Sequence, residues 1–209
     1  MVELTPICHM CRRPEYSGGN CPISSQCKRT PKLNLGCGIS PKERYVNLDA
    51  FQYSGIQGWD KHLQTDVIES IENILEVFPH GYFSEIMSSH VLEHFYFEDA
   101  LVFLKNQRVL LREGGKIVVE APCVLGCYRW YLEDRAGPKE PNGIRFLIES
   151  LYPYQNRLEY SELMAHKSGW TGPVCAEELT KIGFDIVHVG EGITHGTAWH
   201  DFRVEGIKR

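Results

Sequence analysis

A glycine-rich turn and an acidic residue are the first positions in this sequence whose types and spacing could bind a ligand. Gly36-Cys37-Gly38 follows a short apolar stretch, and Asp49 ends the next one. Glycines at the end of a strand let the backbone approach a ligand closely, because no Cβ atom intervenes. An acid that ends the neighbouring strand can accept hydrogen bonds from the hydroxyls of a ribose. The pair predicts a nucleoside-like ligand; the alternative is a structural turn beside a surface aspartate.

The spacing around this turn disfavours a dinucleotide. The dinucleotide fingerprint would place a third glycine at position 41, where this chain has Pro41. The two strands are separated by only eight residues, Cys37 to Arg44, which are too few for an ordinary crossover helix. Because a helix N-terminus is what usually holds a pyrophosphate, a ligand without phosphates fits better.

The segment His90-Val-Leu-Glu93-His94 contains the candidate catalytic residues His90, Glu93 and His94. Imidazoles titrate near neutral pH and suit proton transfer. The same spacing is the inverted zincin peptidase signature, but that motif lies within a helix, whereas this segment follows a strand directly. A structural alternative is that Glu93 and His94 only cap and pack the turn. His200 and Asp201, together with His195, could face the same cleft.

Four of the eight cysteines lie within the first 27 residues, at Cys8, Cys11, Cys21 and Cys27. Clustered thiolates suggest a zinc site in a segment with too little apolar content to fold alone. His9 could replace one ligand, and a reduced tail without metal is the alternative. We expect residues 1–31 to form a cysteine-rich appendage.

The apolar pattern from residue 32 onward predicts strands that alternate with helices. Helices are expected at 68–78, 97–111 and 176–182, the last with Gly183 as its C-cap, and strands at 32–36, 45–49, 63–67, 82–88, 116–120, 184–189 and 198–207. Such alternation favours a parallel, doubly wound α/β sheet. The last two strands have no helix between them, which favours a closing hairpin with an antiparallel strand. Residues 122–172 interrupt the pattern with prolines and aromatic side chains.

Four stretches in this order resemble the class I S-adenosylmethionine-dependent methyltransferases. They are Leu-Asn-Leu-Gly-Cys-Gly, Tyr-Val-Asn-Leu-Asp, Ser-Ser-His-Val-Leu-Glu-His-Phe and Leu-Arg-Glu-Gly-Gly-Lys-Ile-Val-Val-Glu-Ala-Pro. The sequence is most similar to a small bacterial group of this family with a shortened first helix. The resemblance implies a Rossmann-like domain over residues 32–209, with seven mostly parallel strands ordered 3-2-1-4-5-7-6 and strand 7 antiparallel. It also implies a substrate lid at about 122–172, which could instead be a cap with an ordinary apolar core.

The resemblance implies S-adenosylmethionine as cofactor and a role for each matching residue. Gly36, Cys37 and Gly38 would line its methionine portion, and Asp49 would hold the ribose. The adenine would lie against Asp66 and the Val67 backbone, although an acid there could simply be an N-cap. Ser89 and His90 would lie next to the transferred methyl group. Some methyltransferases bind a divalent ion through a similar Glu-His cluster, but His90 stands where those enzymes usually have another acid.

Composition limits the remaining function classes. The net charge of −5 disfavours duplex nucleic acid as a partner, while RNA stays open. The sequence has no apolar run long enough to span a bilayer and no pattern of a signal peptide, so we expect a cytoplasmic protein. The leading hypothesis is methyl transfer to an oxygen or nitrogen of a small molecule, such as a saccharide. The alternative is a non-catalytic protein- or RNA-binding module with a zinc-bound cysteine segment.

Overall fold

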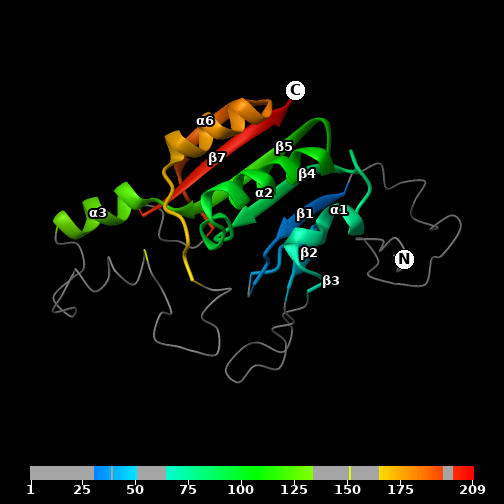
Figure 1. Ribbon diagram of the computed structural model, residues 1–209, viewed down its shortest axis with the longest axis horizontal. Coiled ribbons are helices and arrows are strands. Elements are labelled where there is room, and N and C mark those ends of the chain that lie inside the picture. Colours follow the sequence, from blue (N-terminus) through cyan, green and yellow to red (C-terminus); the bar gives the residue numbers. More distant parts are fainter. Residues whose placement is uncertain (1–30, 39, 51–64, 134–150, 152–164, 195–199) are drawn as a thin grey trace, which may run out of the picture.

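The computed structural model describes residues 31–38, 40–50, 65–133, 151, 165–194 and 200–209, and every structural statement concerns these residues. They contain a sheet of seven strands in the order β3-β2-β1-β4-β5-β7-β6 (Figure 1). The strands are β1 Lys32–Leu35, β2 Val46–Asp49, β3 Val67–Ile68, β4 Phe83–Ser89, β5 Leu111–Pro122, β6 Phe184–Glu191 and β7 Asp201–Lys208. This order is the one expected from the sequence.

Strand β7 is the antiparallel member of the sheet. It pairs antiparallel with β5, where Lys116 lies opposite Ile207, and antiparallel with β6, where Phe184 lies opposite Lys208. The pairs β1–β2, β1–β4, β2–β3 and β4–β5 are all parallel. The predicted fold class, a Rossmann-like and mostly parallel sheet with an antiparallel strand 7, is therefore confirmed.

Helices α1, α2 and α6 form a layer on one face of the sheet, where α2 contacts both of the others (Figure 1). Their bounds are Ile74–Val77, Phe97–Leu110 and Gly172–Ile182. Helix α3, Val124–Leu132, follows β5 and extends away from the sheet. The central strands carry consecutive buried residues, as expected of parallel strands covered by helices. The core is made of apolar side chains such as Leu33, Leu35, Ile86, Leu104, Ile117, Val119, Leu179 and Val204.

The predicted helix at 68–78 is mostly wrong. Ile68 belongs to β3 and is 58% exposed, and a 3₁₀ turn, η1 Ile71–Asn73, follows it. The α-helical part is limited to Ile74–Val77 because Phe78 is extended (φ −119°, ψ 145°), the conformation that a following proline favours. The third strand, expected at 63–67, occupies Val67–Ile68, and residues 63 and 64 lie outside the described residues.

Helix α6 begins earlier than predicted and ends where expected. Thr171 caps its N-terminus, since the hydroxyl accepts a hydrogen bond from the amide of Val174 at 3.4 Å. Gly183 ends the helix in the left-handed conformation (φ 106°), which glycine adopts without strain.

Residues 1–30 of the expected appendage at 1–31, and most of the insertion at 122–172, lie outside the described residues. In the described part of the insertion, Trp170 is buried (1% exposed) and its ring stacks on that of Phe97, with centroids 4.8 Å apart. Trp170 therefore packs in the core. Among the described residues, no helix combines the length and apolar character needed to cross a membrane.

Candidate functional site

The turn after β1 has a backbone shape that requires glycine. Gly36 and Gly38 have φ angles of +63° and +50°. A Cβ atom on Gly36 would lie 2.3 Å from Cγ2 of Val91, so both the conformation and the space exclude a side chain there. The amide of Cys37 donates to the Leu48 carbonyl at 3.0 Å, which carries the pairing of β1 and β2 into the turn.

Asp49 ends β2 at the same edge of the sheet and holds this turn in place. Its Oδ2 accepts a hydrogen bond from the amide of Gly38 at 2.8 Å. The side chain is nearly buried, with the residue 8% exposed. The Gly38 amide and the Asp49 carboxylate, which are eleven residues apart in the sequence, therefore form a direct hydrogen bond.

Two asparagines organise the connection from β1 to β2, where residues 36–38 and 40–45 contain no helix. Oδ1 of Asn47 accepts from Nδ2 of Asn34 at 2.9 Å and from the amide of Lys42 at 2.7 Å. Nδ2 of Asn47 in turn donates to the Lys42 carbonyl at 3.1 Å. These bonds satisfy loop backbone groups that a helix would otherwise satisfy. Neither asparagine was predicted as a site residue from the sequence, although their positions on adjacent strands could have suggested the contact.

The Cys37 side chain is buried beside this turn and lies 3.8 Å from the Thr65 hydroxyl. Burial raises the pKa of the Cys37 thiol to about 11. The group therefore remains an uncharged thiol at neutral pH and does not act as a nucleophile, because the thiolate is the reactive form.

Asp66 and Val67 lie beside β2, at the start of β3. Oδ2 of Asp66 accepts from the backbone amide of Asn47 at 2.8 Å and from its Nδ2 at 3.1 Å. The carboxylate thus holds β2 against the start of β3. Neither residue lines the cavity described next, so the structure does not bring them together with Gly36 and Asp49 around it.

A cavity of about 480 Å³ opens between the glycine turn and the end of β4. Ligand pockets typically measure roughly 300–1,000 Å³. The predicted residues that line it are Gly36, Cys37, Gly38, Asp49, Ser89, His90 and His94. Lining residues that the sequence analysis did not single out include Asn34, Lys42, Ser70, Ile71, Tyr96, Asp99, Lys167 and Thr194.

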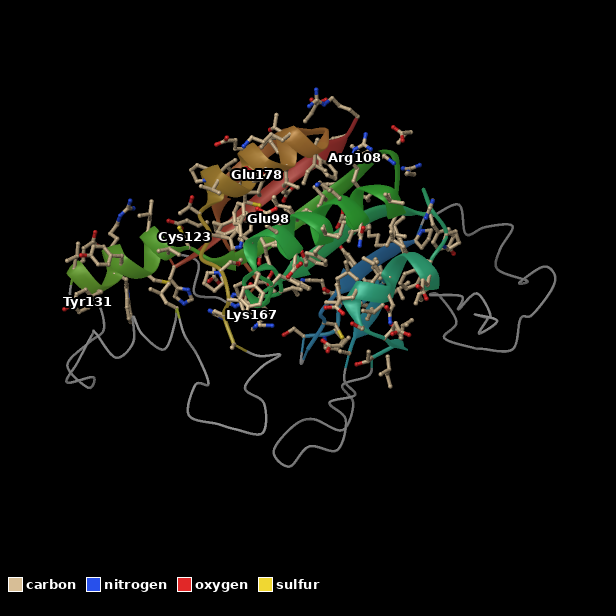
Figure 2. All side chains as sticks on the ribbon, viewed as in Figure 1. Glu98, Arg108, Cys123, Tyr131, Lys167 and Glu178 are labelled. Atoms are coloured by element: carbon tan, nitrogen blue, oxygen red, sulfur yellow. The ribbon has the colours of Figure 1, made fainter. Side chains whose placement is uncertain are left out.

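Lys167 reaches the cavity from the far end of the insertion. Its Nζ lies 5.5 Å from the centre of the Tyr96 ring, which directly precedes α2. Figure 2 shows Lys167 on the segment that passes the start of this helix. No local pattern in the sequence indicates this placement, because the approach depends on how the insertion returns to the sheet.

His90 lies where β4 ends, between two acids. Its backbone is left-handed (φ 55°), and its amide donates to the Glu120 carbonyl at 2.9 Å. Nε2 donates to Oδ2 of Asp201 at 2.9 Å, and Nδ1 lies 3.4 Å from Oε1 of Glu93. Oδ1 of Asp201 accepts from Nδ1 of His200 at 2.8 Å. The structure thereby joins His90 to the distant pair His200 and Asp201; His195 lies outside the described residues.

The charges around His90 shift its titration. Burial alone would lower the pKa of His90, but the hydrogen bond to Asp201 and the charges of Glu93 and Asp201 outweigh it and raise the pKa. Burial likewise opposes ionisation of Asp201, yet the hydrogen bonds from His200 and His90 hold its pKa far below the usual range. Asp201 is therefore an anion at neutral pH, and it favours the protonated form of His90.

Glu93 and His94 lie on a 3₁₀ turn, η2 Leu92–His94, and not on an α-helix. This geometry differs from the helical arrangement that a zincin peptidase requires. Burial raises the pKa of Glu93 to about 7, and burial lowers the pKa of His94. The His166 side chain approaches from the insertion, with Nε2 3.7 Å from Oε1 of Glu93.

The four N-terminal cysteines of the expected zinc site, Cys8, Cys11, Cys21 and Cys27, lie outside the described residues. The other four cysteines, Cys37, Cys123, Cys127 and Cys175, are free thiols.

Comparisons with known proteins give a likeness of structure but not of sequence. No protein-family model matches the chain, and no curated protein matches it. An S-adenosylmethionine-dependent methyltransferase from Archaeoglobus fulgidus is similar, with a TM-score of 0.55, 13% identity, and coverage of 90% of this chain and 91% of that one. One from Methanosarcina mazei has a TM-score of 0.54, 14% identity, and coverage of 90% and 98%.

A third similar structure contains ligands. It is the 1,6-didemethyltoxoflavin N1-methyltransferase of Burkholderia thailandensis, bound to 1,6-didemethyltoxoflavin and S-adenosylhomocysteine. Its TM-score is 0.54 at 12% identity, and the match covers 89% of this chain and 74% of that one. The chain therefore has the Rossmann-like fold of S-adenosylmethionine-dependent methyltransferases.

Proposed function

We propose that this protein transfers a methyl group from S-adenosylmethionine to an oxygen or nitrogen nucleophile of a small molecule. The observation that carries the proposal is the hydrogen bond between the Gly38 amide and the Asp49 carboxylate. It joins the glycine turn to an acid at the carboxyl edge of a parallel sheet, beside a cavity of ligand size. In open α/β sheets, this edge is where ligands bind.

The residues around the turn suit the cofactor. Gly36 and Gly38 expose backbone without side chains, and nothing among the described residues lies within 4 Å of a Cβ built on Gly38. That position can therefore accommodate the methionine portion, with Cys37 beside it. Asp49 can accept bonds from ribose hydroxyls, since a carboxylate has room for several donors. Ile71 lines the cavity and offers an apolar surface to a base, while the assignment of Asp66 and Val67 to the adenine remains a prediction.

When bound, S-adenosylmethionine supplies a methyl group activated by a sulfonium. The protein aligns the acceptor and excludes water, and it must take up the proton that an oxygen or nitrogen nucleophile loses. His90 is the candidate proton acceptor because it lines the cavity and because Asp201 holds its Nε2–H. That bond leaves Nδ1 as the basic nitrogen, and the Asp201 anion stabilises the resulting imidazolium. Glu93 and His94 adjoin it as further catalytic candidates, and Ser89 lies at the cavity wall.

The polar wall of the cavity favours a hydroxylated acceptor such as a saccharide. Asp99, Lys167 and Thr194 offer charge and hydrogen bonds, and Tyr96 offers an exposed aromatic ring. We further propose membership of the bacterial group with a shortened first helix, on the strength of the helix-free connection between β1 and β2. A cytoplasmic location remains a prediction.

Isothermal titration with S-adenosylhomocysteine and S-adenosylmethionine tests the proposal. We expect binding to the wild-type chain. In an Asp49→Asn variant, binding should weaken by about 1–3 kcal/mol, the usual contribution of hydrogen bonds to a charged group. Asp185→Asn removes an exposed carboxylate on β6 and serves as the matched control, with affinity unchanged. No binding at millimolar ligand, or equal affinities for both variants, would refute the cofactor assignment.

A further inference from the structure

Glu93 is a buried carboxylate whose charge the protein satisfies poorly. The residue is 2% exposed, and neither carboxylate oxygen makes a hydrogen bond within the described residues. A buried anion without such bonds is strongly destabilising unless a cation compensates it. His90 is the near candidate, with Nδ1 3.4 Å from Oε1, but the same imidazole donates from Nε2 to the Asp201 carboxylate. One imidazole thus faces two acids.

The imidazoles of His94 and His166 lie near this carboxylate, and the three side chains together are of the types that bind metal ions. One ligand atom from each of Glu93, His94 and His166 can be chosen so that all three lie within 4.8 Å of one another. Nε2 of His166 is 3.7 Å from Oε1 of Glu93, and the His94 and His166 rings meet edge to face with centroids 5.1 Å apart. Zinc bonds of about 2.0–2.2 Å keep tetrahedral ligand atoms about 3.4 Å apart, so small side-chain shifts would close the site.

The backbone holds the two halves of this group together. The carbonyl of Glu93 accepts hydrogen bonds from the amides of Lys167 at 2.7 Å and Ser168 at 3.2 Å. The segment that carries His166 is therefore fixed against η2. Nδ1 of His94 lies 3.3 Å from the Ala165 carbonyl, and it must be the donor because a carbonyl can only accept.

That hydrogen bond sets the tautomer of His94, since protonated Nδ1 leaves the lone pair on Nε2. A backbone carbonyl that accepts from the non-ligating nitrogen is the usual outer-shell partner of a metal-binding histidine. His94 also lines the cavity. An ion bound here would have three protein ligands and a side open to the cavity, the pattern of catalytic rather than structural sites.

We propose that Glu93, His94 and His166 form a binding site for a divalent transition-metal ion, with zinc as the best-fitting candidate. Two imidazole nitrogens and one carboxylate oxygen are a set that zinc and its first-row neighbours bind well, whereas magnesium prefers oxygen ligands. The proposed ligands are nitrogen and oxygen atoms of these three side chains and include none of the N-terminal cysteines. Metal binding here does not depend on the proposed methyl transfer, and it can be measured without cofactor or acceptor.

The test uses the full-length chain with the four N-terminal cysteines replaced by serine, which removes the competing thiolates. After dialysis against chelator, zinc is titrated by calorimetry and counted by elemental analysis. We expect one ion per chain, and a cobalt derivative with visible d–d bands but without the near-ultraviolet charge-transfer band of thiolate ligands. In this background, Glu93→Gln and His166→Asn should each weaken zinc binding at least tenfold. His188→Asn, which removes an exposed imidazole on β6, should leave it unchanged.

Two results would overturn the proposal. One is the absence of stoichiometric zinc in the chain without its four N-terminal cysteines, while its circular dichroism shows a folded protein. The other is equal zinc affinity in His166→Asn and His188→Asn. If Glu93→Gln fails to fold, His166→Asn and the cobalt spectrum decide the matter. Failure of cofactor binding in the earlier titration would leave this result unaffected.

Discussion

The tight contact between Gly36 and Val91 predicts a large and specific effect of a single methyl group. Gly36→Ala places a Cβ atom 2.3 Å from Cγ2 of Val91 in a backbone conformation with φ +63°. Val91 is buried at 5% exposure, and its β-branched side chain has little rotational freedom to move away. The added methyl group must therefore displace backbone or core.

The expected cost has two parts. The left-handed conformation costs a residue with a Cβ atom roughly 1–2 kcal/mol. Overpacking a filled core costs about 1–3 kcal/mol more. The free energy of unfolding should thus fall by about 2–5 kcal/mol, a large share of the roughly 5–15 kcal/mol of a typical domain. Gly114→Ala should incur only the cost of the left-handed conformation. Its φ is +67°, but nothing among the described residues lies within 4 Å of the new Cβ.

Urea denaturation followed by circular dichroism measures both variants. A third variant, Gly36→Ala combined with Val91→Ala, removes the clashing methyl group and should recover about 1–3 kcal/mol relative to the sum of the single substitutions. The reasoning fails if Gly36→Ala destabilises no more than Gly114→Ala. It also fails if the two substitutions at Gly36 and Val91 are additive.

Three more predictions concern charge and packing. Glu85 accepts hydrogen bonds from Lys32 and Tyr45. Although burial opposes ionisation of Glu85, these bonds and the charge of Lys116 lower its pKa. Because a depressed pKa stabilises the fold above the pKa of the unfolded chain, Glu85→Gln should cost about 1–3 kcal/mol at neutral pH, and the difference should shrink below about pH 4.3; equal loss at acid pH in urea titrations would contradict this. Asp201→Asn should lower the pKa of His90 in nitrogen NMR of the metal-free protein, and an unchanged value would exclude the proposed charge pair. Trp170→Ala should destabilise by about 3–5 kcal/mol in thermal unfolding while Trp170→Phe costs clearly less, whereas a small effect of both would favour a role in the substrate lid.

Much of the fold could be predicted because its elements follow from local patterns. The strand before Gly36, the strand ended by Asp49 and the helix ended by Gly183 all show apolar periodicity bounded by residues that turn the chain. The absence of a helix between the last two strands indicated the antiparallel β7. The prediction failed at 68–78, where helical spacing of apolar residues is real but Pro79 and the short β3 leave space for a single α-helical turn.

The site divides in the same way. Gly36, Gly38 and Asp49 could be identified from the sequence because parallel strands bring their carboxyl ends to one edge, so order along the chain dictates proximity. The partners of His90 and Glu93, which are Asp201 and His166, could not be identified from the sequence. These contacts depend on long-range packing, which the periodicity of the sequence does not encode.

The amino-acid sequence thus specified which strands form and where a nucleoside could lie, because both follow from neighbours along the chain. The order of the strands was implied by the resemblance to the methyltransferase family. Folding in three dimensions was needed to place Asp201 against His90 and His166 against Glu93. The physical reason is that burial and hydrogen-bond partners, which set the charge and ligand character of these side chains, come from segments far away in the sequence. The chemistry of the pocket therefore arises from the packing of the insertion and β7 onto the end of β4.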